Sequence, residues 1–381
     1  MNTQVAKPVR RLLLDLTHPD AAAGSSDGPV RDDLSVVAQS GRCLWTASDE
    51  TTTLERLVTT DWESFGEHRP FRLGDFFDLP AGPDQESDIE GIGIDGSWLW
   101  VTGSHSLKRK KPGQDERADP DALLERLARI ECEPNRYLLG RIPLVPEERE
   151  GVFTLARTAP DPNGGKPRTA ACLKTKGGSN ALTSALRRDV HLAPFLNVPA
   201  KENGFDIEGL AAHGDKLFLG LRGPVLRGWA VILELSVKAT KSGDLKLRRI
   251  GDDGERYFKH FLDLDGLGIR ELCFHGEDLL ILAGPTMDLD GPVVLYRWRG
   301  ALTASDDSLV PAERMERMFT VPHGAGFDHA EGMTVLNAPD RPPALLVIYD
   351  SPGADRRRGG SGAVEADLFA FPPPSGEPSP T

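Results

Sequence analysis

Five segments of this 381-residue chain repeat one motif, and each places a polar residue at the same point of it. The two clearest copies are Asp88-Ile-Glu-Gly-Ile and Asp206-Ile-Glu-Gly-Leu, each followed by a Gly-containing turn and a second apolar segment. Carboxylates that converge in this way are the oxygen ligands that a hard cation such as Ca²⁺ prefers. Aligned on the Glu of Glu-Gly, the copies form a first column, at spacings of 55, 118, 62 and 61 residues: Ser35, Glu90, Glu208, Arg270 and Glu331.

Further ionisable residues accompany this column. Asp88, Asp206 and His329 stand two residues before their column members. Arginine offers an anion charge-assisted hydrogen bonds, and histidine can act as a general base or a ligand, so Arg222, Arg270 and His105 are candidate catalytic residues. The second segments, aligned on their apolar residues, place a second column at the same end: Asp49, Ser104 with His105 beside it, Arg222, Gly284 and Asp350.

Two interpretations of these columns are open. In the structural one, each Glu accepts hydrogen bonds from backbone N–H groups of neighbouring repeats, and Arg222 and Arg270 neutralise the excess negative charge. In the functional one, the carboxylates bind a cation, because buried charges around one axis must be paired, metal-bound or hydrated. The candidate metal ligands are Glu90, Glu208, Glu331, Asp49 and Asp350.

The elements that must position these residues are β-strands. Each motif supplies two strands joined by the turn, a third strand follows, and a fourth precedes the next motif. A lone four-stranded sheet cannot bury both faces, whereas a closed ring of such sheets can. The sequence therefore predicts an all-β protein, a β-propeller of five blades with one long insertion in blade 2. The doubled interval of 118 residues leaves six blades as the alternative, with an eroded repeat near residue 150.

The N-terminal segment has the apolar pattern of a fourth strand but no third strand before it. Val9–Leu16 is therefore expected to lie beside Asp367–Phe371, where it would close the ring and cover an unpaired sheet edge. The same pattern predicts the other outer strands, at Arg69–Leu79, His191–Val198, Tyr257–Leu264 and Met318–Val321.

Residues 1–371 are expected to form a single domain, with a helical and loop insertion at about residues 104–190. Although 381 residues ordinarily suggest two or more domains, a ring of repeats shares one cooperative core. The Pro-rich residues 372–381 predict a disordered tail.

The insertion opens with a basic arm. Its residues Ser104–Lys111 lead to a predicted helix over Asp119–Ile130, with Asp119 as the N-cap and Pro120 at the first helical position. A shorter helix is predicted near Asn180–Arg188. The arm, residues 104–134, offers a surface for a protein partner.

Composition narrows the classes of function. A net charge of −13 disfavours nucleic acid and anionic membranes as partners, and the chain has no run of 18 apolar residues that would span a membrane. The first residues lack the apolar stretch of a secretory signal, and the four cysteines lack metal-ligand spacing. These features predict a cytoplasmic protein with reduced cysteines.

Four strings of the sequence carry a family resemblance: Asp88-Ile-Glu-Gly-Ile, Trp100-Val-Thr-Gly-Ser-His-Ser, Lys201-Glu-Asn-Gly-Phe-Asp-Ile-Glu-Gly-Leu and Leu221-Arg-Gly-Pro-Val-Leu-Arg-Gly-Trp-Ala. They resemble a bacterial family of domains of unknown function, number 3616, and the resemblance runs from about Val9 to Phe371. It implies a propeller fold and no particular activity.

The Asp-Ile-Glu-Gly opening is more distantly similar to the phytase-like esterases and the calcium-dependent lactonase propellers. In those families inward acidic residues hold calcium and assist the hydrolysis of phosphate esters or lactones. This chain departs from them because Ser35 and Arg270 stand in the acidic column, which puts a complete metal cage in question.

Two functions follow from these observations. The first is a hydrolase of a small anionic ester, in which Ca²⁺ held by Glu90, Glu208 and Glu331 polarises the ester oxygen. Arg222 and Arg270 would hold the anion, and His105 or a carboxylate would activate water. The alternative is a non-catalytic ligand-binding or protein-interaction scaffold, in which the carboxylates brace the ring and the arm 104–134 binds the partner.

Overall fold

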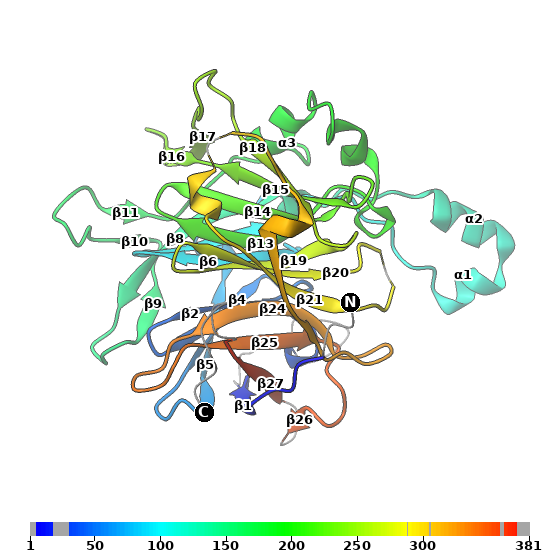
Figure 1. Ribbon diagram of the computed structural model, residues 1–381. Coiled ribbons are helices and arrows are strands. Elements are labelled where there is room, and N and C mark those ends of the chain that lie inside the picture. The colour runs from blue at the N-terminus through cyan, green and yellow to red at the C-terminus, as the bar shows by residue number, and fades with distance from the viewer. Residues whose placement is uncertain (1–4, 18–29, 288, 305, 359–361, 372–381) are drawn as a thin grey trace.

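The computed structural model describes residues 5–17, 30–287, 289–304, 306–358 and 362–371. Over these residues the protein is all-β and propeller-like, built from repeated four-stranded antiparallel units (Figure 1). The predicted tail, 372–381, lies outside the described residues. Among those that are described, no helix is both long and apolar enough to cross a membrane.

The four-stranded units follow one another along the chain. The first contains β2 (Leu34–Ser40), β3 (Cys43–Ser48), β4 (Thr53–Val58) and β5 (Ser64–Arg72). The second contains β6 (Ile89–Asp95), β7 (Trp98–Gly103), β8 (Leu139–Pro146) and β12 (Ala171–Cys172). The third contains β13 (Asp206–His213), β14 (Lys216–Gly223), β15 (Trp229–Leu235) and β18 (Phe258–Asp263), with β22 (Ser308–Val310) parallel to β18.

Two further units complete the series. One contains β19 (Gly268–His275), β20 (Asp278–Gly284), β21 (Val293–Trp298) and β23 (Met315–Val321). The other contains β24 (His329–Leu336), β25 (Ala344–Asp350), β27 (Ala363–Ala370) and the N-terminal β1 (Arg10–Asp15). Short strands occupy the connections: β9 (Phe153–Leu155), β10 (Thr158–Ala159), β11 (Arg168–Thr169), β16 (Val237–Ala239), β17 (Leu245–Leu247) and β26 (Arg357–Arg358).

The first strands of the units form a closed ring of neighbours. β2 packs against β6 and β24, β13 packs against β6 and β19, and β19 packs against β24. The apolar core is divided in the same way, because each buried cluster joins side chains of two neighbouring units. Each sheet therefore buries both faces against its neighbours, as the argument from isolated four-stranded sheets requires.

The N-terminal strand joins the last unit to the first, as the sequence predicts. β1 pairs antiparallel with β27, with Arg10 opposite Leu368, and its Leu14 pairs in parallel with Phe65 of β5. Leu12 and Leu14 are buried in the cluster between these two units. The chain's first described strand thus fills the place that the sequence left empty beside β27.

One predicted outer strand is wrong and another is displaced. The strand predicted at Arg69–Leu79 is β5, Ser64–Arg72, and a 3₁₀ helix at Leu73–Asp75 follows it. His191–Val198 contains a 3₁₀ helix, Ala193–Asn197, and the fourth strand of the second unit is the two-residue β12. Pro194 lies inside the predicted segment and has no N–H to donate to a sheet, so a ladder there would lose a hydrogen bond. The connection before it, expected to be irregular, supplies β9 to β12 instead.

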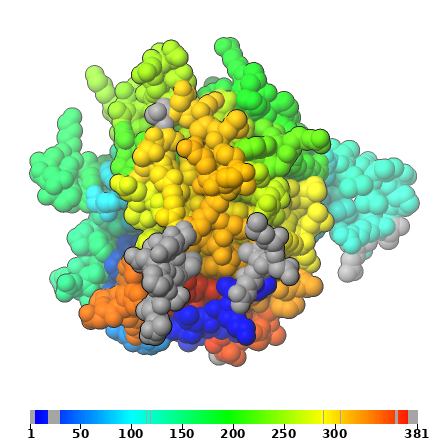
Figure 2. Space-filling model, viewed as in Figure 1, coloured from blue at the N-terminus to red at the C-terminus, as the bar shows by residue number. Residues whose placement is uncertain are grey.

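The arm carries two helices that project from the body of sheets (Figure 1). They are α1 (Gln114–Ala118) and α2 (Pro120–Ala128), and Figure 2 shows them as a knob on the surface. The Asp119 side chain accepts hydrogen bonds from the backbone N–H groups of Asp121 and Ala122, which confirms the predicted N-cap. A third helix, α3 (Ala181–Leu186), is capped by Asn180.

Closure through β1 makes a quantitative prediction. Leu14 is 1% exposed, so Leu14→Ala should lower the free energy of unfolding by about 2–5 kcal/mol, the range for truncating a buried leucine. Val9, 61% exposed just before β1, is the matched control, and Val9→Ala should change it by no more than about 0.5 kcal/mol. Urea denaturation measures both values. Equal midpoints for the two variants would contradict closure by a packed β1.

Candidate functional site at the mouth of the ring

A β-bulge positions every member of the first column. In β6, Ile89 faces Gly103 and Gly91 faces Thr102, so that Glu90 has no partner in the register. A bulge of this kind re-aims the extra side chain out of the normal alternation. The other four inner strands have the same irregularity, which leaves Ser35, Glu208, Arg270 and Glu331 without a partner in the register. The first column therefore reflects a repeated backbone feature.

The glycine that follows the bulged Glu lets two units approach closely. A Cβ at Gly91 would lie 2.7 Å from Cβ of Leu210 in the next unit, and one at Gly332 would lie 3.1 Å from the backbone of Val36. Gly209 is crowded in the same way. Since any side chain there would clash, Glu-Gly combines a re-aimed carboxylate with a tight contact between inner strands.

Two arginines neutralise one half of the mouth. Arg270 Nη1 lies 3.1 Å from Glu208 Oε2 and 2.8 Å from Glu331 Oε1. Arg222 binds Glu208 and lies 3.1 Å from Asp206 Oδ2. The column residues are thus brought together, but Glu208 and Glu331 are ion-paired and are not open ligands as predicted. Burial nevertheless raises the pKa of Glu331 to about 7, against the opposing effect of Arg270.

The other half of the mouth gathers carboxylates. One oxygen from each of Asp49, Asp88 and Glu90 lies within 4.8 Å of the others, a spacing that suits a shared cation. Burial, and then the neighbouring negative charges, hold the pKa values of Asp49 and Glu90 well above their usual range. Arg136 Nη2 lies 2.7 Å from Asp88 Oδ1. Like charges that crowd together in this way favour protons or a metal ion.

Asp350 belongs to the same neighbourhood. Its charge contributes to the raised pKa values of Asp49 and Glu331. It also lies 3.6 Å, oxygen to Nδ1, from His329, whose Nε2 lies 3.1 Å from Asp290. These two carboxylates raise the pKa of His329, whose side chain is 37% exposed.

His105 is differently placed from the general base that the sequence suggests. It is 2% exposed, its Nδ1 lies 2.9 Å from the Gly103 carbonyl, and its Nε2 lies 2.8 Å from Asn180 Nδ2. With both ring nitrogens engaged, no nitrogen is open to a substrate. Burial lowers its pKa to about 4, so it is a neutral residue that fixes Asn180, the cap of α3.

A cavity of about 370 Å³ opens on the arginine half, and Asp49, Asp88 and Glu90 are not among the residues that line it. Arg222, Arg270, Glu331 and Asp350 line it, together with His329. Two cations come from elsewhere: Lys201, which precedes β13, and Lys111 of the arm. The arm reaches this place because Leu107 forms a bridge with Pro199 and Arg109 binds Glu202.

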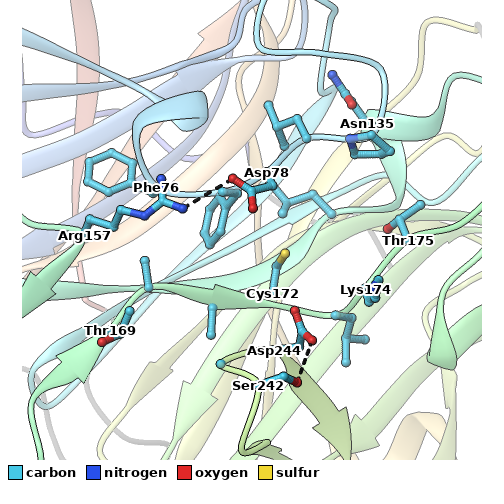
Figure 3. A pocket seen from close by; sticks show the side chains of 18 of the residues that line it. Phe76, Asp78, Asn135, Arg157, Thr169, Cys172, Lys174, Thr175, Ser242 and Asp244 are labelled. Carbon is cyan, nitrogen blue, oxygen red and sulfur yellow. Dashed lines mark hydrogen bonds and ion pairs between the residues drawn. The ribbon is translucent and has the colours of Figure 1, made fainter.

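A second cavity of about 370 Å³ lies away from the mouth (Figure 3). It is lined by Phe76 and Cys172 among others, and its charged pair, Asp78 and Arg157, is solvent-exposed. Burial raises the pKa of the Cys172 thiol to about 11, which makes it a poor nucleophile. The residues around this cavity offer no concentration of buried charge, so the candidate site is the mouth.

A serine, a histidine and a carboxylate also meet in the third unit. His260 Nδ1 lies 2.7 Å from Ser308 Oγ, and its Nε2 lies 3.1 Å from Glu234 Oε2. The order is that of a nucleophilic triad. However, His260 is 0% exposed and packs between the rings of Phe218 and Trp298. A substrate cannot reach it, and we assign this group to packing.

Sequence reasoning placed Asp88 and His329 beside the first column by their spacing, but it gave neither of them a role. It missed Lys201. Lys201 gave no such signal, because it lies in a 3₁₀ turn outside the repeat (Ala200–Glu202). Only the folded chain shows that this turn borders the cavity.

The bridging role of Arg270 is testable by truncation. Arg270→Ala would leave Glu208 and Glu331 facing each other without this cation, and it should cost about 3–5 kcal/mol of unfolding free energy. The control is Arg358→Ala, since Arg358 is 51% exposed and solvent screens its pair with Glu365, which should contribute little to stability. Chemical denaturation compares them. Equal losses for the two variants would show that Arg270 bridges nothing of consequence.

Crowding of the carboxylates predicts a pH-dependent stabilisation by Asp49→Asn. Because the folded-state pKa of Asp49 is raised, its ionised form is disfavoured in the folded protein, and stability falls as pH rises from about 4 through the folded pKa. Without divalent cations, the variant should melt at a higher temperature at pH 8, by a margin that shrinks toward pH 4. Asp95→Asn, at the other end of β6, is the control. A lower melting temperature for Asp49→Asn at pH 8 would be the opposite result.

Solved structures of other proteins show weak similarity to the chain. It is 9% identical to hydrazine synthase of Kuenenia stuttgartiensis, with 87% of this chain and 59% of that chain covered and a TM-score of 0.31. It is 12% identical to the PQQ-bound aldose sugar dehydrogenase of Streptomyces coelicolor, with 95% of this chain and 100% of that chain covered and a TM-score of 0.35. It is 10% identical to an exo-1,5-alpha-L-arabinanase from a bovine ruminal metagenomic library, with 90% of this chain and 94% of that chain covered and a TM-score of 0.34. Values this low identify no activity.

No curated protein matches the chain significantly. One family model does, and it is described as protein of unknown function (DUF3616). The match covers residues 33–367, from the residue before β2 to the middle of β27. It thus includes both columns and the arm, and the chain belongs to the DUF3616 family.

Proposed function

We propose that the mouth of the ring binds a small anionic ester together with a hard cation and hydrolyses the ester. The observation that carries this proposal is the separation of charge at one opening. Arg222 and Arg270 lie on one side, whereas Asp49, Asp88 and Glu90 crowd on the other. A site divided in this way offers a partner to each end of such a ligand.

Asp49 and Glu90 are the residues that would hold the cation, with Ca²⁺ as the leading candidate, and Asp88 would share its carboxylate between the cation and Arg136. The oxygens of these three carboxylates lie within 4.8 Å of one another. Burial raises their pKa values, and for Asp49 and Glu90 neighbouring negative charges add to this effect, which a cation would offset. Asp350, whose charge also raises the pKa of Asp49, is a further candidate ligand. The cation would supply Lewis acidity to the ester oxygen.

Arginine and lysine side chains would orient the anion. Arg270 is already held between two glutamates, so it loses little side-chain entropy when it binds an anion. Lys201 has no ion-pair partner among the described residues, and its charge is available to the ligand. The fork of Arg222 is fixed in the same way by Asp206 and Glu208.

Proton transfer falls to Glu331 and His329 in this proposal, in place of His105. Burial sets the pKa of Glu331 at about 7, in the range that suits a general base or acid at neutral pH. His329 lines the same cavity, and its raised pKa favours the protonated form, which can donate a proton. Glu331 would accept a proton from the attacking water, and His329 would donate one to the leaving oxygen.

The architecture that we propose for this site is a five-bladed propeller in one domain, residues 1–371, with an insertion at about 104–190. The ring of neighbouring first strands and the clusters shared between adjacent units support five blades. No additional first strand stands in that ring between β6 and β13, which pack directly against each other.

A screen with matched variants tests the proposed function. Phosphate esters and lactones are incubated with Ca²⁺, Mg²⁺ or Mn²⁺, and turnover is measured before and after chelation. Glu90→Gln and Asp49→Asn should abolish both turnover and the rise in melting temperature with the cation, whereas Asp95→Asn should keep both. Stabilisation without turnover would indicate a structural ion. Turnover that survives chelation and Glu90→Gln would exclude the cation from the mechanism.

A second function, a protein-interaction scaffold, is favoured by one observation. The projecting helix α2 has no buried side chain, and Leu124, Leu127 and Ile130 at its end are 66%, 47% and 43% exposed. An exposed apolar face of this kind is typical of a docking helix. If the arm binds a protein partner and takes no part in the reaction, Leu124→Ser with Leu127→Ser should remove partner binding and leave ester turnover unchanged.

A further inference from the structure

The cavity at the mouth has an apolar wall as well as cations in its lining. Met287 and Leu289, in the loop from β20 to β21, line it and are 42% and 61% exposed. Pro285 and Val293 at the ends of this loop line the same space. Arg270 and Lys201 line it as well, so charge and apolar surface meet within about 370 Å³.

These side chains differ from the other exposed apolar residues of the chain. Leu309 and Val190 are more exposed, at 65% and 83%, but neither lines the cavity. Single exposed residues of that sort are ordinary and need no explanation. Met287 and Leu289, by contrast, lie two positions apart on the rim of a polar site, where apolar exposure has a cost unless a ligand covers it.

Resting on the proposed function, we infer the class of ligand: an amphiphilic anion, with a phosphate or carboxylate head and a short alkyl, acyl or aryl group. The head would lie on Arg270 and Lys201, and the apolar group would cover Met287 and Leu289. Methionine has three rotatable bonds and a polarisable sulfur, so this wall can adapt to groups of different shape. A cavity near 370 Å³ is at the small end for ligand pockets, which favours a short chain.

In a phosphate ligand, the cleavable bond would be the P–O bond that joins the head to the apolar group, because a phosphate monoester keeps its negative charge. Water adds to the phosphorus as Glu331 takes its proton, the P–O bond breaks, and the alcohol, or the acid where the group is acyl, leaves with the proton donated by His329. A carboxylate head is charged only when it is free, so in a carboxylate ligand the ester bond would lie within the apolar part. Water would add to the carbonyl carbon of that ester, and the products would be an alcohol and a second acid. Neither reaction needs an oxidant or another co-reactant.

Calorimetric titration of the full chain, with Ca²⁺ present, tests this inference by chain length. Hexyl phosphate is compared with methyl phosphate, and hexanoate with acetate, so that the two head groups are distinguished. Burial of two methylene groups is enough for about a tenfold gain in affinity. We expect hexyl phosphate to bind at least about tenfold more tightly than methyl phosphate, and hexanoate at least about tenfold more tightly than acetate.

Variants assign the gain to the apolar wall. Met287→Ser with Leu289→Ser should remove most of the chain-length gain and leave methyl phosphate affinity unchanged, whereas the control Leu309→Ser should keep the gain. Lys201→Met should weaken both phosphates to a similar degree.

Each outcome separates this inference from the proposed function. Methyl and hexyl phosphate that bind equally well would overturn the amphiphilic ligand and leave the anion site standing. A chain-length gain that survives the double serine variant would place the apolar contact elsewhere and overturn it too. If neither phosphate nor carboxylate binds, the anion site itself is wrong, and both proposals fall.

Discussion

Repulsion among carboxylates at one opening is the constraint on which the rest of the mouth depends. Each inner strand presents its bulged residue toward the same place, and a ring of Glu at every position would be unstable. On one side of the mouth, Arg270 relieves the repulsion by lying between Glu208 and Glu331. On the other side, the carboxylates of Asp49 and Glu90 stay crowded, and burial keeps their pKa values high. The same ionisable residues that identify the site in the sequence therefore divide it into a side where the carboxylates are ion-paired and a side where they are crowded.

The repeat explains how much of this the sequence could predict. Strands that carry the motif, the capped helix α2 and the closing strand β1 follow from local patterns that survive folding unchanged. The fourth strand of the second unit does not, because a two-residue β12 has no periodicity to detect. For the site, the alignment brought Arg270 to the glutamates, but residue type alone could not show that His105 has both nitrogens occupied. The fold, and not the residue type, determines which groups a side chain hydrogen-bonds.

The degenerate copies show what the Glu-Gly pair does. In the fourth unit, Glu271 stands where the better copies have glycine, and its side chain is 1% exposed. Its Oε1 accepts a hydrogen bond from the N–H of Leu272, and burial holds its pKa well above the usual range. The unit that supplies the bridging arginine has therefore also lost the glycine. In this unit, the replacement of the column glutamate by Arg270 therefore accompanies the replacement of the packing glycine by the buried Glu271.

The pairing of β1 with β27 has a consequence for the order of events during synthesis. Arg10 faces Leu368 across 358 residues of chain, so β1 is made long before β27. Its neighbour β5 follows soon after it, but until the last unit is made Leu12 and Leu14, both fully buried in the finished protein, lack the part of their cover that β27 supplies. Contacts between such distant residues form late because loop closure is costly before they are made. β1 thus stays incompletely covered until synthesis of the last unit is finished.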